Sequence, residues 1–90
     1  MRRVRLFVSG LVQGISFRSF VKRNAILLDL KGFVKNLPDG RVECVFEGED
    51  DKINQIISIC NKGSDGSDIK SIDIKEEEFT AEFKDFIIVY

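Results

Sequence analysis

The chain has 90 residues, of which 43% are hydrophobic, and this length fits one small domain, so we expect residues 1–90 to close around a single core. It contains no histidine, which excludes Ser-His-Asp and Cys-His catalytic groups, phosphohistidine chemistry and every histidine-containing metal site. The net charge is −1, but residues 1–45 carry nine Lys or Arg against three Asp or Glu, whereas residues 46–90 carry five against twelve. This asymmetry indicates either an anionic ligand of the first half or attraction between the two halves.

Neither the cysteines nor the apolar segments indicate a secreted or membrane protein. Cys44 and Cys60 lie sixteen positions apart without a second pair, which fits neither a disulfide framework nor a zinc site. We expect two buried free thiols and no bound metal. The apolar run at residues 4–8 is shorter than the hydrophobic part of a signal peptide, and no segment approaches the length needed to cross a bilayer. The expectation is a cytoplasmic protein that does not bind membranes.

The first predicted elements are a strand and an amphipathic helix joined by a glycine-containing loop. Residues 4–8 alternate with the period of two that marks a strand with one buried face. Gly10 and Gly14 permit a tight loop, and Ser16 is expected to cap a helix that begins near Phe17. The apolar stripe of this helix recurs every three to four residues and consists of Phe17, Val21, Ala25 and Leu28.

A β-hairpin and a second helix follow. The strand-like residues 32–36 and 41–47 flank the turn at residues 37–40, in which Pro38 fixes φ and Gly40 accepts a positive φ. Acidic residues 49–51 suit the N-terminus of the second helix. The apolar stripe of that helix consists of Ile53, Ile56, Ile57 and Cys60, and Gly63 closes it.

The last part of the chain predicts two more strands. Residues 63–67 are rich in Ser, Asp and Gly and form a loop, and Ile69, Ile72 and Ile74 predict a fourth strand that ends in acidic residues 76–78. Residues 86–90 predict a short terminal strand at a sheet edge. The order β-α-β-β-α-β is typical of a ferredoxin-like α+β sandwich, an antiparallel sheet with both helices on one face.

The loop between the first strand and the first helix is a candidate anion site. Unpaired N–H groups at the helix start, the helix dipole and the guanidinium of Arg18 would together form a concave site for a phosphate. The alternative from this local pattern is an ordinary strand-to-helix turn with Arg18 in solvent.

Two segments carry a family resemblance. Residues 8–18, Val-Ser-Gly-Leu-Val-Gln-Gly-Ile-Ser-Phe-Arg, resemble the acylphosphatase signature Gly-x-Val-Gln-Gly-Val-x-Phe-Arg, which forms a phosphate cradle. Residues 25–43 resemble the second signature of that family, whose Asn orients the hydrolytic water. The resemblance implies hydrolysis of acyl phosphates, the carboxyl-phosphate anhydrides, by Arg18 and Asn36 without a cofactor or metal. It also implies a phosphate-binding set, which consists of Gln13, Gly14, Ile15, Ser16, Phe17 and Arg18.

The sequence departs from the family pattern at four places, none of them catalytic. Leu11 replaces a usual basic residue and removes one charge near the cradle, and Ile15 replaces Val. Asp29 stands where Gly is common at the helix end, a position that Asp tolerates better than most residues do. The loop at residues 63–67 lacks the proline that the family often has there.

The chemistry implied by the resemblance is compatible with a chain that lacks histidine. An acyl phosphate expels a carboxylate, which is a weak base, so no general acid is required. Phosphoryl transfer depends mainly on positioning and on neutralising charge, which Arg18 and the loop amides would supply. The amide of Asn36 can hold a water without carrying a charge, and the proton of that water would pass to a phosphate oxygen of the substrate.

Other functions remain open at this stage. The same order of elements underlies RNA-recognition domains, and Lys31-Gly32-Phe33 resembles the start of their aromatic motif, although the residues that follow do not continue it. A metallochaperone would need a Cys-x-x-Cys pair, which the first loop lacks. A catalytically idle domain that binds or regulates is the third alternative. The expected partners are a small acyl phosphate and a phosphate or sulfate anion in the loop, with no nucleic acid, and the expected state is a monomer.

Overall fold

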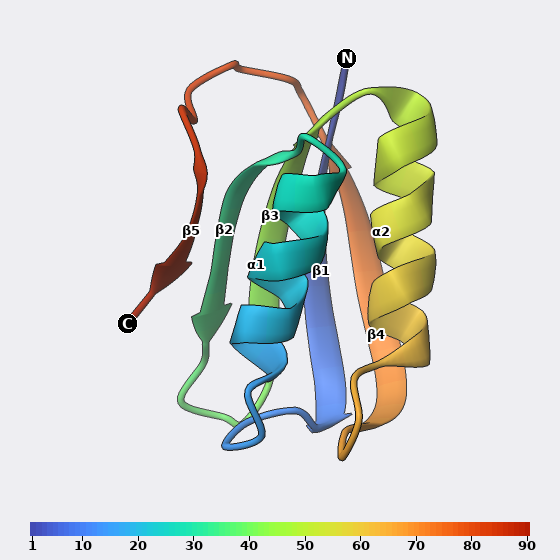
Figure 1. The fold of residues 1–90 in the computed structure, drawn as a ribbon, viewed down its shortest axis with the longest axis vertical. Helices are drawn as coiled ribbons and strands as arrows, with labels where there is room; N and C mark the ends of the chain where they lie inside the picture. The colour runs from blue at the N-terminus through green and yellow to red at the C-terminus, as the bar shows by residue number, and fades with distance from the viewer.

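The computed structural model describes residues 1–90 and places two helices on one face of a five-stranded sheet (Figure 1). The strand order across the sheet is β4-β1-β3-β2-β5. The elements are β1 (Arg2–Leu11), α1 (Phe17–Leu27), β2 (Lys31–Asn36), β3 (Val42–Gly48), α2 (Asp50–Lys62), β4 (Asp68–Glu77) and β5 (Phe86–Val89). The predicted ferredoxin-like α+β fold is confirmed. Neither helix has the length and hydrophobicity that crossing a membrane requires.

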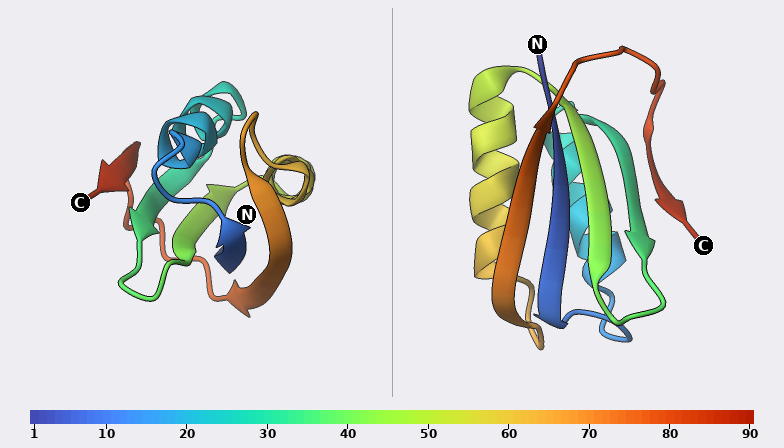
Figure 2. Two further views of the ribbon diagram at one scale, coloured as in Figure 1. Left: turned by 90° about the horizontal axis from the view of Figure 1, so that it is seen from below. Right: turned by 180° about the vertical axis from the view of Figure 1, so that it is seen from behind.

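The sheet is mixed. The expectation of a purely antiparallel sheet is wrong for one strand, β5. Strands β1, β2, β3 and β4 pair in antiparallel fashion, but β5 pairs with β2 in parallel, with Gly32 opposite Phe86 and Lys35 opposite Val89. The reason is the path of residues 78–85. They leave β4 at the end of the sheet where β2 begins and cross over that end to the other edge, so β5 runs in the direction of β2 (Figure 2).

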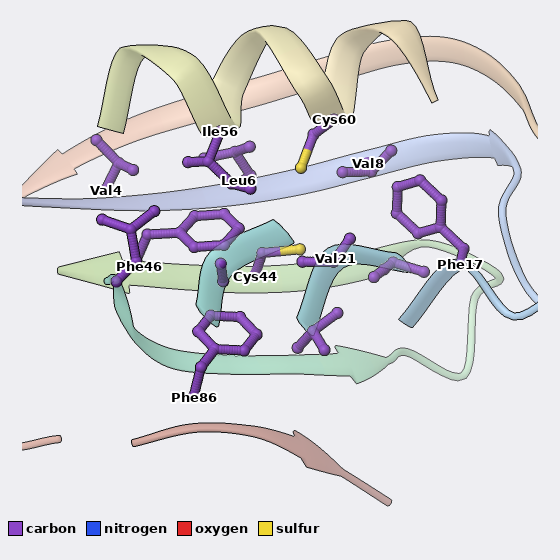
Figure 3. Packing of buried hydrophobic residues seen from close by; sticks show 14 of the residues in the cluster. Val4, Leu6, Val8, Phe17, Val21, Cys44, Phe46, Ile56, Cys60 and Phe86 are labelled. Atoms are coloured by element: carbon purple, nitrogen blue, oxygen red, sulfur yellow. The ribbon is translucent and has the colours of Figure 1, made fainter. Parts of the chain in front are cut away.

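The hydrophobic core lies between the sheet and the two helices (Figure 3). Val4, Leu6 and Val8 of β1 are fully buried, as the alternating pattern predicted. Cys44 and Cys60 are buried free thiols, also as predicted. The neighbouring Cys60 and the burial of the site raise the pKa of the Cys44 thiol well above its ordinary value, so this cysteine is a packing residue at neutral pH.

The structure confirms the predicted start of α1 and the unusual backbone at its end, but not the predicted cap. The helix begins at Phe17 as expected, but Ser16 does not cap it with its side chain and instead adopts the left-handed conformation, with φ of 64°. That conformation places the Ser16 side chain away from the position that accepts hydrogen bonds from the first turn. At the other end Asp29 is left-handed, with φ of 57°, and Leu30 N–H donates to the Ala25 carbonyl at 2.9 Å. Asp therefore occupies the position that glycine commonly fills.

Several of the oppositely charged residues form ion pairs with one another on the sheet face opposite the helices. Arg3 Nε donates to Glu77 at 2.8 Å, and its guanidinium also contacts the buried Glu47 and the more exposed Glu82. Arg5 is bonded to Glu77 at 2.7 Å and to Glu43. Attraction to acidic residues, all but Glu43 from the second half of the chain, thus accounts for these arginines. The three cations of α1 form no ion pair, and they are Arg18, Lys22 and Arg23.

The network predicts how acid affects stability. The hydrogen bonds from Arg5 and Arg3 hold the pKa of Glu77 below its ordinary value of 4.5. The stabilisation is therefore complete above about pH 4.5 and is lost as the pH falls through the lower pKa of the folded state. Urea unfolding should show that Glu77→Gln is less stable than the wild type at pH 7 and that this difference shrinks by pH 3. A difference independent of pH would contradict the prediction.

Candidate active site

The loop between β1 and α1 is bent into a cradle by two special backbone positions. Gly10 lies at an irregularity in the pairing of β1 with β4, and a Cβ there would lie 2.0 Å from the Asp68 carbonyl oxygen, so no larger residue fits. Gly14 and Ser16 both have positive φ, of 75° and 64°. Alternation of left-handed with other backbone conformations forms the concave nests that bind anions. Because no side chain caps α1, the N–H groups of its first turn remain available to a ligand.

A cavity of about 230 Å³ opens beside this cradle, where the N-terminus of α1 meets the ends of β2 and β5. It brings together five residues of the expected site, namely Gly14, Ser16, Phe17, Arg18 and Asn36. The two expected catalytic residues, eighteen positions apart in the chain, therefore face one cavity. Gln13 and Ile15 do not line it, although their backbone amides belong to the same loop.

Arg18 is a half-buried cation without an acidic partner. Its guanidinium lies over the ring of Tyr90, 4.7 Å from the ring centroid. A cation over an aromatic face is held in place without losing its charge, and its N–H groups stay free for a ligand. The site thus contains a permanent positive charge that has no ion-pair partner in the protein.

Asn36 is the last residue of β2, paired with Val42 of β3. Its Oδ1 atom is buried and has no hydrogen-bond partner within the protein. A buried acceptor left unpaired costs on the order of 1–3 kcal/mol, so the absence of a partner for this atom calls for an explanation, such as a bound water or a catalytic role. Asn36 also lines the cavity, so its side-chain amide borders any small polar molecule held there.

Gln13 connects the two halves of the site. Its side-chain Nε2 donates to the carbonyl oxygens of Leu37 and Arg41, each at 2.9 Å. These two carbonyls belong to the turn that directly follows Asn36, and Leu37 N–H also donates to Arg41 across that turn, at 2.8 Å. Gln13 therefore ties the cradle to the end of β2 with its side chain.

Four lining residues of the cavity were not anticipated: Val12, Ser19, Ile88 and Tyr90. The sequence showed that a strand precedes Tyr90, but only the parallel pairing of β5 with β2 brings its end beside Asn36. No group of three or more His, Cys, Asp or Glu side chains is placed to hold a metal ion.

Comparison with known proteins establishes the family. Residues 4–88 match the family model described as Acylphosphatase. The chain belongs to the acylphosphatase family. A relative named Acylphosphatase from Syntrophus aciditrophicus is 42% identical over 90 residues, which cover 100% of this chain and 94% of the relative. Another from Syntrophobacter fumaroxidans is 43% identical over 89 residues, covering 99% and 92%.

A solved structure agrees with this assignment. The crystal structure of acylphosphatase from Bacillus subtilis has a TM-score of 0.96 and 37% identity to this acylphosphatase, with 100% of both chains covered. The predicted family and activity are confirmed: the chain is an enzyme that hydrolyses acyl phosphates.

The two hydrogen bonds of Gln13 predict a role in positioning Asn36. In Gln13→Ala the turn after Asn36 loses its link to the cradle, and small displacements of a positioned group cost large factors in rate. We expect kcat for benzoyl phosphate to fall about tenfold, with a smaller change in KM.

A matched control separates this effect from a general loosening of the turn. Asp39→Ala removes two other hydrogen bonds of the same turn, to Arg41 N–H at 3.0 Å and to Arg41 Nε at 2.8 Å, without touching the cradle. If Asp39→Ala lowered kcat as much as Gln13→Ala does, the specific link from Gln13 would be irrelevant.

Proposed function

We propose that this acylphosphatase binds the phosphoryl group of its substrate with Arg18 and the cradle amides and orients the attacking water with Asn36. The observation that carries the proposal is the shared cavity, which is lined by Arg18, whose guanidinium has no ion-pair partner, and by Asn36, whose amide oxygen has no hydrogen-bond partner in the protein. One group suits an anion and the other suits a water. Hydrolysis of an anionic acyl phosphate needs both.

The phosphoryl group would lie against the start of α1. Arg18 presents a planar set of donors that matches two phosphate oxygens, and its charge is permanent. The backbone amides of residues 13–18 add donors that are fixed before the reaction begins. The positive end of the helix dipole contributes at the same point. Together these groups would stabilise the charge that spreads over the phosphoryl oxygens in the transition state.

The water would be held by Asn36. Its Oδ1 accepts a hydrogen bond from one O–H of the water, which leaves an oxygen lone pair free to attack phosphorus. A new P–O bond forms to the water oxygen while the bond from phosphorus to the acyl oxygen breaks. The carboxylate leaves with the electron pair, and the proton of the water passes to a phosphoryl oxygen. Each step uses groups of the substrate or the cavity, and none needs a histidine.

We also propose a metal-independent, monomeric, cytoplasmic enzyme of one domain. The relatives that this chain covers almost end to end are of nearly the same length, which supports a domain that works alone. Two reduced, buried thiols suit a reducing compartment.

Binding of RNA on the open face of the sheet is the weaker alternative. That face would need free cations and exposed aromatic rings. Instead, Arg3 and Arg5 are engaged by glutamates, and the Phe33 ring packs against Phe83 with centroids 6.0 Å apart. An idle domain is disfavoured for a different reason, since both groups expected to act remain in one cavity.

Substitution of the two proposed catalytic residues tests the mechanism. With benzoyl phosphate in excess chelator, Arg18→Gln should lower kcat/KM by roughly 10²- to 10³-fold through both KM and kcat, because ground state and transition state each lose the charge. Asn36→Ala should lower kcat by about 10²-fold with little change in KM, because the water interacts with it mainly in the reaction step.

The control is Lys62→Gln, which removes one positive charge from an exposed site at the end of α2. It should retain wild-type kinetics. Full activity of Asn36→Ala would eliminate the water-orienting role, and loss of wild-type turnover in chelator would eliminate the metal-independent mechanism.

A further inference from the structure

Several large apolar side chains are exposed along α1 and β5. Ile26 is 56% exposed and Leu27 78% exposed at the end of α1, and Ile87 of β5 is 50% exposed. Exposed apolar residues scattered singly need no explanation, but a contiguous group beside a catalytic cavity indicates a binding surface.

A groove of about 410 Å³ runs between α1 and β5 and includes two of these residues. Its lining consists of Ser19, Lys22, Arg23, Ile26, Leu27 and Ile88. Ser19 and Ile88 also line the cavity that contains Arg18 and Asn36. The groove and the cavity therefore adjoin at these two residues, close enough for one substrate to occupy both.

The groove has a length and direction that suit an elongated group. Ser19, Lys22 and Ile26 are spaced so that they lie along one side of α1. From Ser19 to Ile26 the helix rises by about 10 Å, which a medium-length acyl chain spans. The phosphate end of such a substrate would rest at the helix N-terminus, and its chain would follow the helix away from the cradle.

A second hollow next to the cavity is less suitable for an apolar group. It shares Ser16 with the cavity, and its lining includes Arg23, Ser64 and the carboxylate of Asp65. Ile15 and Phe20 also line this hollow, but the acidic side chain of Asp65 opposes the approach of an anionic substrate. The groove between α1 and β5 contains no carboxylate, and Lys22 and Arg23 line it with long aliphatic stems that end in positive charges.

We propose that this groove binds the acyl group of the substrate and gives the enzyme a preference for apolar acyl groups, aromatic or medium-chain aliphatic, over acetyl. The proposal rests on the proposed function, since it takes Arg18 and Asn36 to hold the phosphate and water. Ile26 and Ile88 would contact the hydrocarbon, and the exposed edge of the groove would leave it partly in water.

The test compares kcat/KM for hexanoyl phosphate with that for acetyl phosphate. In the wild type the ratio should be about ten, because an open groove removes only part of the four added methylenes from water. Ile26→Ser should bring the ratio toward one, and its exposed position allows the substitution without loss of the fold. The matched control is Ile74→Ser, which removes an exposed isoleucine of β4 that does not line the groove; it should keep the wild-type ratio.

The outcomes separate the two proposals. Hydrolysis of both substrates with equal kcat/KM would overturn the acyl groove and leave the roles of Arg18 and Asn36 standing. If Arg18→Gln or Asn36→Ala left kcat/KM unchanged for both substrates, the proposed function would be overturned instead. A dimer in sedimentation that dissociates in Ile26→Ser, with no advantage for the longer chain, would assign the groove to a second copy of the chain and overturn the acyl site.

Discussion

Burial of Val12 and Phe17 is the constraint on which the active site depends. Each residue is 1% exposed, and they bracket the four residues of the cradle that lie between β1 and α1. Because both anchors belong to the core, the ends of the loop are held at a separation set by the packing of α1 on the sheet. The strained, left-handed Ser16 persists between them because its surroundings determine it. Hydrophobic packing thereby fixes a polar site that has few hydrogen bonds of its own.

The ion pairs distinguish two kinds of cation in the chain: those that stabilise the fold and those that remain free for a ligand. Arg3 and Arg5 are satisfied by glutamates on the open face, with Glu47 only 2% exposed and also accepting hydrogen bonds from Thr80 N–H at 2.9 Å and Thr80 Oγ1 at 3.0 Å. This network ties residues 78–85 to the sheet before the chain turns into β5. Arg18 has no such partner. The network therefore helps to position β5, which ends beside the cavity. Because its glutamates pair with Arg3 and Arg5, the positive charge of Arg18 at the cavity remains unpaired.

The sequence predicted the elements that follow from local periodicity and turn chemistry. The alternation at residues 4–8 and the turn at residues 37–40 reappear in the structure, as do three residues of the α1 stripe, Phe17, Val21 and Ala25; Leu28 lies just after the helix and is only half-buried. What it did not predict depends on tertiary arrangement. The direction of β5 follows from the path of residues 78–85 over the end of the sheet, and that path also places Tyr90 beside Arg18. The hydrogen bonds of Gln13 join residues 24 and 28 positions apart, a separation that no local pattern encodes. Charge counting left two interpretations open because it cannot tell paired cations from free ones.

The two proposed catalytic groups lie on elements of different kinds, a helix and a strand. Their relative position therefore depends on contacts between these two elements. Arg18 lies in the first turn of a helix, whose N-terminus supplies the dipole and the free amides, whereas Asn36 is the last residue of a strand that pairs with β3 and β5. A helix and a strand packed through a core can shift relative to each other by small amounts. Gln13 opposes such shifts by its hydrogen bonds to the turn after Asn36, whereas Tyr90, which contacts Arg18, is itself largely exposed. The distance between these two proposed catalytic groups is thus set by tertiary contacts, and it is reached only when the sheet and α1 are assembled.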